Sequence, residues 1–142
     1  MLPQRELYLI AIDSMIGFRY SSELEMQPLT SQFLPLSPAV LHILMALAGE
    51  DRHGYGIMRE VARQSDGQYR LGPGTLYDNL KRLLDRGLVA ESAKAGDGDD
   101  SRRRYYRLTN LGRQVLAADI TRLEEMFRAA KLGLAGTKPR RA

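Results

Sequence analysis

Apolar residues in the middle of the chain recur at the spacing of short helices, with turn-forming residues between them. Ser37 and Pro38 suit the cap and the first position of a helix that ends near Gly49. A polar turn over Glu50–Gly54 follows, and Tyr55–Gln64 has the pattern of a second helix. Short helices joined by short turns predict a small, mainly helical domain.

A third helix is predicted from Pro73 to just before Gly87, with one apolar and one polar face. Its apolar residues are spaced i, i+4, i+7 and i+8, and therefore share one side: Leu76, Leu80, Leu83 and Leu84. Pro73 suits a first turn because its missing N–H has no partner there, and Gly87 suits the left-handed residue after a helix end. The polar face is left for solvent or a partner.

Two short strands are predicted after this helix. Leu88–Ala93 and Arg102–Leu108 are the strands of a hairpin, and the stretch 95–101 between them is a turn rich in Gly and Asp. Side chains alternate along a strand, so Tyr105 and Tyr106 are expected on opposite faces.

A long final helix is predicted from the N-cap Thr109 to about Leu132. Its apolar residues follow the spacing of an a/d seam: Leu116, Ile120, Leu123, Phe127, Ala130 and Leu134. Such a helix is roughly 30 Å long, as long as the small domain itself. We therefore expect a second subunit to cover Leu123 and Phe127, which makes a homodimer; packing of the helix on its own domain is the alternative.

Together these elements predict a mainly α fold with a small β-hairpin. A winged helix-turn-helix DNA-binding domain is expected over residues 36–108 and a C-terminal dimerisation helix over 109–134. Residues 1–35 form an N-terminal segment with three open interpretations: a disordered leader, an arm packed on a partner subunit, or an artefact of the gene model with Met26 as the true start. Residues 135–142 are expected to be a disordered basic tail.

Composition refines this prediction through the distribution of charge. The 142 residues carry a net charge of only +4, but residues 101–107 hold four arginines and no acid. A local basic cluster favours nucleic acid, because phosphate contacts act at short range. Leu7–Ile12 is too interrupted by charge for a signal peptide, and no apolar run reaches membrane length. We therefore expect a cytoplasmic protein that does not bind membranes.

Catalytic and metal sites are not expected. The absence of cysteine excludes disulfides, thiol catalysis and thiolate metal sites. His42 reads as a core or interface residue and His53 as support for a turn, and neither has triad partners. Asp97–Asp100 resembles a calcium loop, but Leu108 stands where a bidentate Glu is required. Gly72–Thr75 lacks the Gly-Lys pair of a phosphate loop. The prediction is no enzyme, no cofactor and no metal.

Five short motifs occur in register over about half the chain: His53-Gly54-Tyr55-Gly56-Ile57, Gly72-Pro73-Gly74-Thr75-Leu76-Tyr77, Leu80-Lys81-Arg82-Leu83, Gly87-Leu88-Val89 and Arg104-Tyr105-Tyr106-Arg107-Leu108-Thr109. In this order they resemble the PadR family of bacterial transcriptional regulators, in its compact branch with a single C-terminal dimerisation helix. The resemblance implies a winged helix-turn-helix dimer that represses transcription, often with an effector that releases it from DNA. The chain departs from the family at Asp78, commonly proline, and lacks the tryptophan that stacks aromatic effectors.

The third helix is expected to lie in the major groove of double-stranded DNA. Thr75 and Asn79 are the candidate base readers, since threonine meets a thymine methyl and asparagine pairs with adenine. Lys81 and Arg82 are expected to hold phosphates. Asp78 either accepts from a cytosine or, as we favour, orients a neighbouring arginine.

The remaining candidate contacts come from tyrosines and from the hairpin. Tyr55 is expected to approach the DNA backbone, and Tyr77 to be half-buried. Arg102, Arg103 and Arg104 should straddle backbone and minor groove, with at least one facing away. Alternatives are a solvated helix face and a winged-helix adaptor that binds protein without DNA. A hydrophobic effector between the long helices, lined by Met126 and Phe127, and a dry interface both fit the apolar residues there.

Overall fold

The computed structural model describes residues 29–93 and 103–136. The predictions for most of the leader, for Met26, for the turn Asp97–Asp100, for Arg102 and for the tail beyond position 136 lie outside these residues. The chain divides into two units, Met1–Leu34 and Pro35–Ala142. In the first unit, residues 29–31 are helical. All further elements belong to the second unit.

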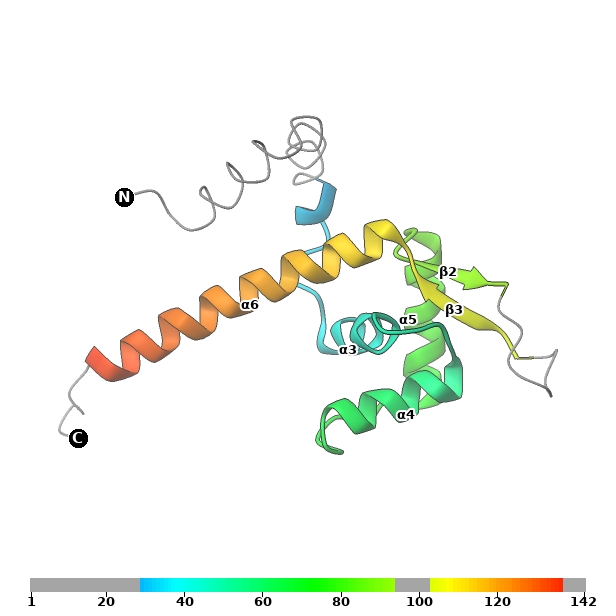
Figure 1. Cartoon of the computed structure of the whole chain (residues 1–142), viewed down its shortest axis with the longest axis horizontal. Coiled ribbons are helices and arrows are strands. Elements are labelled where there is room, and N and C mark those ends of the chain that lie inside the picture. The colour runs from blue at the N-terminus through cyan, green and yellow to red at the C-terminus, as the bar shows by residue number, and fades with distance from the viewer. Residues whose placement is uncertain (1–28, 94–102, 137–142) are drawn as a thin grey trace. The chain divides into compact units, whose positions relative to one another are not determined.

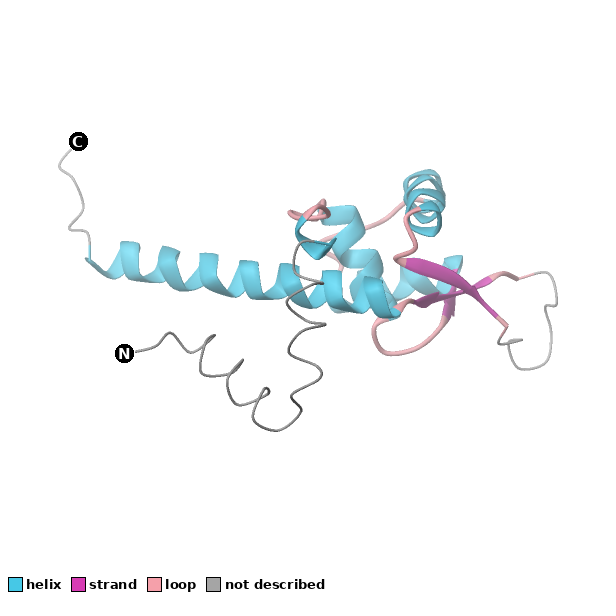
Figure 2. Cartoon of the chain, turned by 90° about the horizontal axis from the view of Figure 1, so that it is seen from above, coloured by secondary structure: helices cyan, strands magenta, loops and turns pink. Residues whose placement is uncertain are grey.

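The second unit is mainly helical with a small sheet, as predicted (Figure 1). Its elements are, in order, α3 (Pro38–Leu47), β1 (Arg52–His53), α4 (Gly54–Gln64), α5 (Pro73–Asp85), β2 (Val89–Ser92), β3 (Tyr105–Leu108) and α6 (Asn110–Gly136). In Figure 2 the hairpin of β2 and β3 projects from one end of this unit, away from the C-terminal end of α6. No helix of the described residues has both the length and the hydropathy needed to cross a membrane.

The sheet has three antiparallel strands in the order β1-β3-β2. Val89 of β2 lies opposite Leu108, and Arg52 of β1 lies opposite Tyr106. The hairpin strands were predicted, but β1 was not: the prediction of a polar turn over Glu50–Gly54 is wrong there. A strand of two residues has no alternation to reveal it, and only its pairing with β3 makes it a strand.

Side chains cap three of the four long helices, at the predicted Ser37 and Thr109 and at His53. The Val40 N–H donates to Ser37 Oγ at 3.3 Å, and the Gly56 N–H donates to His53 Nδ1 at 3.0 Å. The Gly112 N–H donates to Thr109 Oγ1 at 3.0 Å. Each cap satisfies one backbone N–H that has no partner within its helix.

The core lies between α3, α4, α5 and the first part of α6. Aliphatic side chains from every one of these helices are fully buried in it, and the carboxylate of Asp119, paired with Arg122 at 2.7 Å, is buried as well; the aliphatic ones are Ile43, Leu44, Leu47, Ile57, Val61, Leu76, Leu80 and Val115. Leu83 is buried as predicted, but Leu84 is only half-buried because it stands at the edge of the helix face. Gly112 brings α6 against β2, and a methyl group there would collide with the Leu88 carbonyl oxygen.

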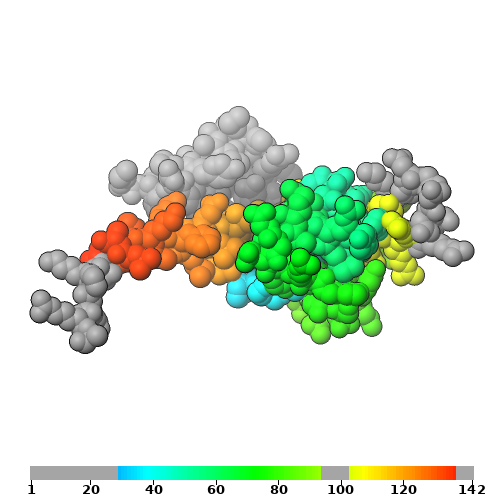
Figure 3. Space-filling view, turned by 90° about the horizontal axis from the view of Figure 1, so that it is seen from below, coloured from blue at the N-terminus to red at the C-terminus, as the bar shows by residue number. Residues whose placement is uncertain are grey.

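Helix α6 has two parts with different surroundings. Up to Asp119 it is packed on the domain, with Val115 and Leu116 buried. From there the helix projects past α4 and α5, as the orange and red atoms show in Figure 3. Its exposed large apolar residues are Ile120, Met126, Phe127, Leu132 and Leu134. The prediction of Leu116 as an interface residue is therefore corrected, because its own domain covers it. The helix also runs beyond Leu132 to Gly136, into the predicted tail.

Candidate nucleic-acid interface

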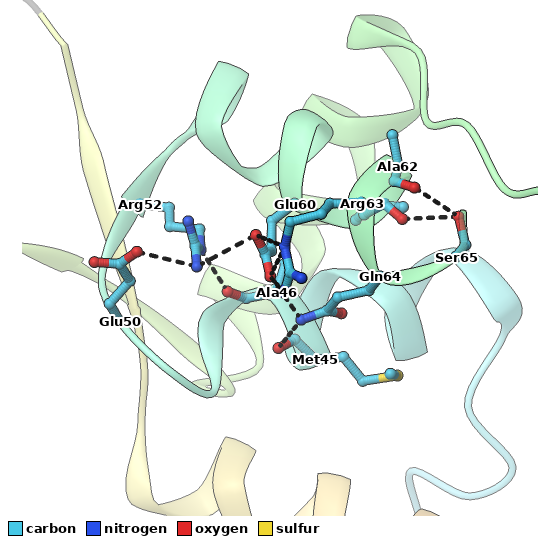
Figure 4. Close-up of polar contacts among 10 residues, drawn as sticks. Met45, Ala46, Glu50, Arg52, Glu60, Ala62, Arg63, Gln64 and Ser65 are labelled. Carbon is cyan, nitrogen blue, oxygen red and sulfur yellow. Dashed lines mark hydrogen bonds and ion pairs between the residues drawn. The ribbon is translucent and has the colours of Figure 1, made fainter. Parts of the chain in front are cut away.

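A buried carboxylate, Glu60, fixes α4 against the end of α3 (Figure 4). Arg52 donates through Nε to the Ala46 carbonyl at 2.8 Å, and its Nη2 lies 3.6 Å from Glu60. Arg63 Nε lies 3.0 Å from Glu60 Oε2, and Gln64 Nε2 donates to Glu60 Oε1 at 3.1 Å. The hydrogen bond from Arg63, with the charges of Arg52 and Arg63, lowers the pKa of Glu60 although burial opposes this. The network fixes β1, and with it the residue that follows Arg52.

That residue is His53, which caps α4 and faces the hairpin. Its ring lies parallel to the Tyr55 ring at 6.5 Å between centroids and meets Tyr105 edge-on at 5.3 Å. Its Nε2 lies 3.1 Å from Arg103 Nη1. Burial, followed by the charges of Arg103 and Arg59, lowers the pKa of His53. Both effects favour the neutral imidazole, the form in which Nδ1 can accept from the Gly56 N–H.

A surface pocket of about 340 Å³ opens beside this histidine. It is lined from β1, α4, α5 and the hairpin by His53, Gly54, Tyr55, Tyr77, Arg103, Arg104 and Tyr106. The Tyr77 hydroxyl lies directly over Gly54, where a methyl group would collide with it. Burial and then the nearby Tyr77 raise the pKa of Tyr106, so its hydroxyl stays protonated. Guanidinium groups, hydroxyls and an imidazole are all hydrogen-bond donors, and none of the lining residues carries a carboxylate.

Four of the lining residues were predicted as DNA contacts, and the structure brings them together. Tyr55 is 59% exposed, and the Arg59 guanidinium lies 5.9 Å from its ring centroid. Tyr77 is half-exposed, in line with its predicted half-buried position. Arg104 lies 3.6 Å from Glu91, whereas Arg103 approaches His53, so the two arginines have different partners. His53 was predicted only to support the turn; its second ring nitrogen, which faces Arg103, could not be placed from the sequence.

The polar face of α5 continues the surface beyond the pocket. Thr75, Asp78, Lys81 and Arg82 are exposed on it. Asn79 is half-buried, and its Nδ2 donates to the Thr75 carbonyl at 2.8 Å. The amide is thus turned onto its own helix, and must rotate away before it can pair with a base. Asp78 has no hydrogen bond or ion pair among the described residues, so the expected arginine partner is not found there.

Comparisons with known proteins agree with this architecture. The model of the transcriptional regulator PadR-like family matches residues 43–118. A transcriptional regulator of Mycobacterium tuberculosis is 41% identical over 88 residues, which are 62% of this chain and 78% of that protein. A solved transcriptional regulator from Clostridium thermocellum is 27% identical, with a TM-score of 0.53 over 70% of this chain and 90% of that one.

A solved structure of Bacillus subtilis PadR in complex with operator DNA also matches. It is 22% identical, with a TM-score of 0.50 over 59% of this chain and 46% of that chain. At this identity the likeness concerns the fold alone. It agrees with the predicted winged helix-turn-helix.

Proposed function

Because this chain belongs to the PadR-like family of transcriptional regulators, we propose that it binds double-stranded DNA as a homodimer and represses transcription. The observation that carries the proposal is the donor-rich pocket, to which α5 contributes Tyr77, together with the exposed Lys81 and Arg82 of the same helix. It joins a helix of major-groove dimensions to a hairpin bearing exposed arginines. The fold is shared with the Bacillus subtilis protein that was solved with operator DNA.

In this proposal α5 enters the major groove and the hairpin follows the backbone beside it. Thr75 and Asn79 face the bases, while Lys81 and Arg82 hold phosphates. Tyr55, Tyr77 and the hairpin arginines Arg102, Arg103 and Arg104 contact the backbone and the adjacent minor groove. Asp78 meets either a cytosine or an arginine brought near by DNA binding.

The dimer is proposed to form through the projecting part of α6. Phe127 is 64% exposed and Met126 is 54% exposed, and both stand on a helix that leaves its own domain. Apolar surface of this kind is removed from water when a second copy packs on it. Ile120, Leu123, Phe127 and Ala130 form the proposed seam. A two-fold dimer places its recognition helices about 34–36 Å apart, so the operator is expected to be an inverted repeat.

The test is a gel shift on the duplex upstream of the chain's own gene, repeated on random-sequence duplex and over a range of salt. Arg103→Ala should weaken both duplexes about equally and reduce the slope of log affinity against log salt by about 0.9 for each phosphate that the variant no longer neutralises. Asn79→Ala should weaken the upstream duplex mainly. Arg107→Ala is the matched control, because Arg107 is an exposed arginine of β3, four residues after Arg103, and lies outside the pocket.

Two outcomes decide against parts of the proposal. If the wild-type protein does not bind duplex DNA at low ionic strength, the proposal of DNA binding is wrong. The alternative, a winged-helix adaptor that binds protein without DNA, then replaces it. If light scattering shows a monomer at micromolar concentration, the α6 dimer is wrong. A small apolar molecule that dissociates DNA while the dimer persists would add an effector to the proposal.

A further inference from the structure

We propose that His53 is itself a DNA contact: its Nε2–H and the Arg103 guanidinium donate to one backbone phosphate seated in the pocket. This inference rests on the proposed function and adds a residue and a ligand atom to it. Its starting point is a conflict between two hydrogen bonds at one imidazole ring.

A neutral imidazole has one nitrogen that accepts and one that donates. In this ring both nitrogens face donors: the Gly56 N–H lies 3.0 Å from Nδ1, and Arg103 Nη1 lies 3.1 Å from Nε2. Only one of the two donors can be accepted. The Gly56 N–H is fixed by the first turn of α4, whereas Arg103 is an exposed side chain. The cap therefore takes the lone pair of Nδ1, and Nε2 carries the proton.

Consequently the Arg103 guanidinium and the His53 Nε2–H, which are both hydrogen-bond donors, face each other. An acceptor placed between them would accept a hydrogen bond from each group. A phosphate oxygen is such an acceptor, because it accepts several hydrogen bonds and carries the charge that a guanidinium favours. None of the residues that line the pocket carries a carboxylate, and the described Glu91 pairs with Arg104 outside it.

The surroundings of His53 suit an anion in three further ways. Tyr55 and Tyr77 line the same pocket and each adds a hydroxyl group. The pocket includes the first two residues of α4, and a helix N-terminus carries partial positive charge. Arg59, whose charge also acts on His53, lies over the Tyr55 ring at the rim. A backbone phosphate is the anion that the proposed docking of α5 and the hairpin brings to this place.

The substitution His53→Asn in the full-length protein tests the role of Nε2 apart from the capping role of Nδ1. Asparagine caps helices well, with its oxygen near the position of Nδ1, but it lacks the outward N–H. We expect an unchanged melting temperature and about tenfold weaker binding to a labelled random-sequence duplex. The salt slope should stay the same, because a neutral donor releases no counterion.

Arg103→Gln and the double variant, which carries both His53→Asn and Arg103→Gln, complete a double-mutant cycle. Arg103→Gln should weaken binding and lower the salt slope. The double variant should bind more tightly than the product of the two single effects predicts, because both groups hold one phosphate. Effects that multiply, or His53→Asn binding as tightly as wild type, would overturn this inference. Wild-type protein that binds no duplex would instead overturn the proposed function.

A measurement on the wild-type protein removes any dependence on folding of the variants. Spectra of ¹⁵N-labelled histidine should show His53 protonated at Nε2 and unprotonated at Nδ1. Addition of the random-sequence duplex should shift the Nε2 signal and leave Nδ1 in its capping state. A ring protonated at Nδ1, or an Nε2 signal that does not shift when DNA is added, would contradict the inference.

Discussion

Helix α4 has a cluster of charged or polar groups at each end. The two clusters differ in the kind of group that lies beside their arginines. Around Glu60 the guanidinium groups of Arg52 and Arg63 share a carboxylate that is only 11% exposed. The lining of the pocket at the other end has no carboxylate: Arg103 lies beside the His53 imidazole, and Arg104 pairs with Glu91, which is 55% exposed, outside the lining. An arginine that shares a buried acid holds helices together, whereas arginines grouped with neutral donors form a surface suited to an external anion.

Glu60→Ala should break the first cluster and have the largest effect. Removal of the shared carboxylate ends its hydrogen bonds with Arg63 and Gln64 and leaves Arg52 beside a vacated, largely buried position. We expect the free energy of unfolding to fall by about 2 kcal/mol, measured by urea denaturation.

Glu50→Ala is the matched control for this prediction. Glu50 also pairs with Arg52, at 3.0 Å, but its side chain is 56% exposed. A pair of this kind is screened by water and contributes less than about 1 kcal/mol. If both substitutions destabilised the protein equally, burial would not be what distinguishes the Glu60 cluster.

Gly54→Ala should disturb the pocket, and we expect a smaller change in free energy than for Glu60→Ala. The added methyl group forces the Tyr77 hydroxyl out of its position over α4, so the pocket changes shape. We expect about fivefold weaker binding to random duplex, which corresponds to about 1 kcal/mol, by fluorescence anisotropy. Gly49→Ala is the control, because nothing lies within 4 Å of a methyl group there. Equal affinities of both variants would show that the pocket is not part of the interface.

Lowering the pH should reduce the melting temperature in two separate pH ranges, one for His53 in the pocket and one for Glu60. These are the smallest of the expected effects. The pKa values of His53 and Glu60 are both lowered in the folded chain, so each group stabilises the fold above its unfolded pKa. This stability is lost as the pH falls through the folded pKa, first for His53 and then for Glu60. The melting temperature should therefore fall in two steps. His53→Asn should remove the upper step and Glu60→Gln the lower one.

Much of this fold could be predicted because its signals are local. The leucine spacing of α5, the caps Ser37 and Thr109 and the left-handed Gly87 are all properties of a few consecutive residues. The same holds for the hairpin strands. Four of the pocket-lining residues are also among the predicted DNA contacts, since they belong to a helix start, a polar helix face and the arginine-rich stretch that leads into β3.

The features that sequence reasoning missed depend on residues far apart in the chain. Strand β1 exists only because Arg52 lies opposite Tyr106. Heptad spacing cannot say which copy covers a leucine, and Leu116 is covered by its own domain. Nor does residue type say where an amide turns, as Asn79 shows. The donor that His53 presents to Arg103 becomes visible only when cap and hairpin are seen together.

The missing side chain of Gly112 has a mechanical consequence. It seats α6 directly on the Leu88 backbone, and Thr109 ties the same junction through hydrogen bonds to the Leu88 carbonyl at 3.1 Å and the Gly87 carbonyl at 2.6 Å. At this point the backbone of α6 lies against the backbone that leads into β2, with the Leu108 side chain beside it. In the proposed dimer the hairpin would therefore move together with α6, and a change in the angle between the two paired α6 helices would shift both hairpins.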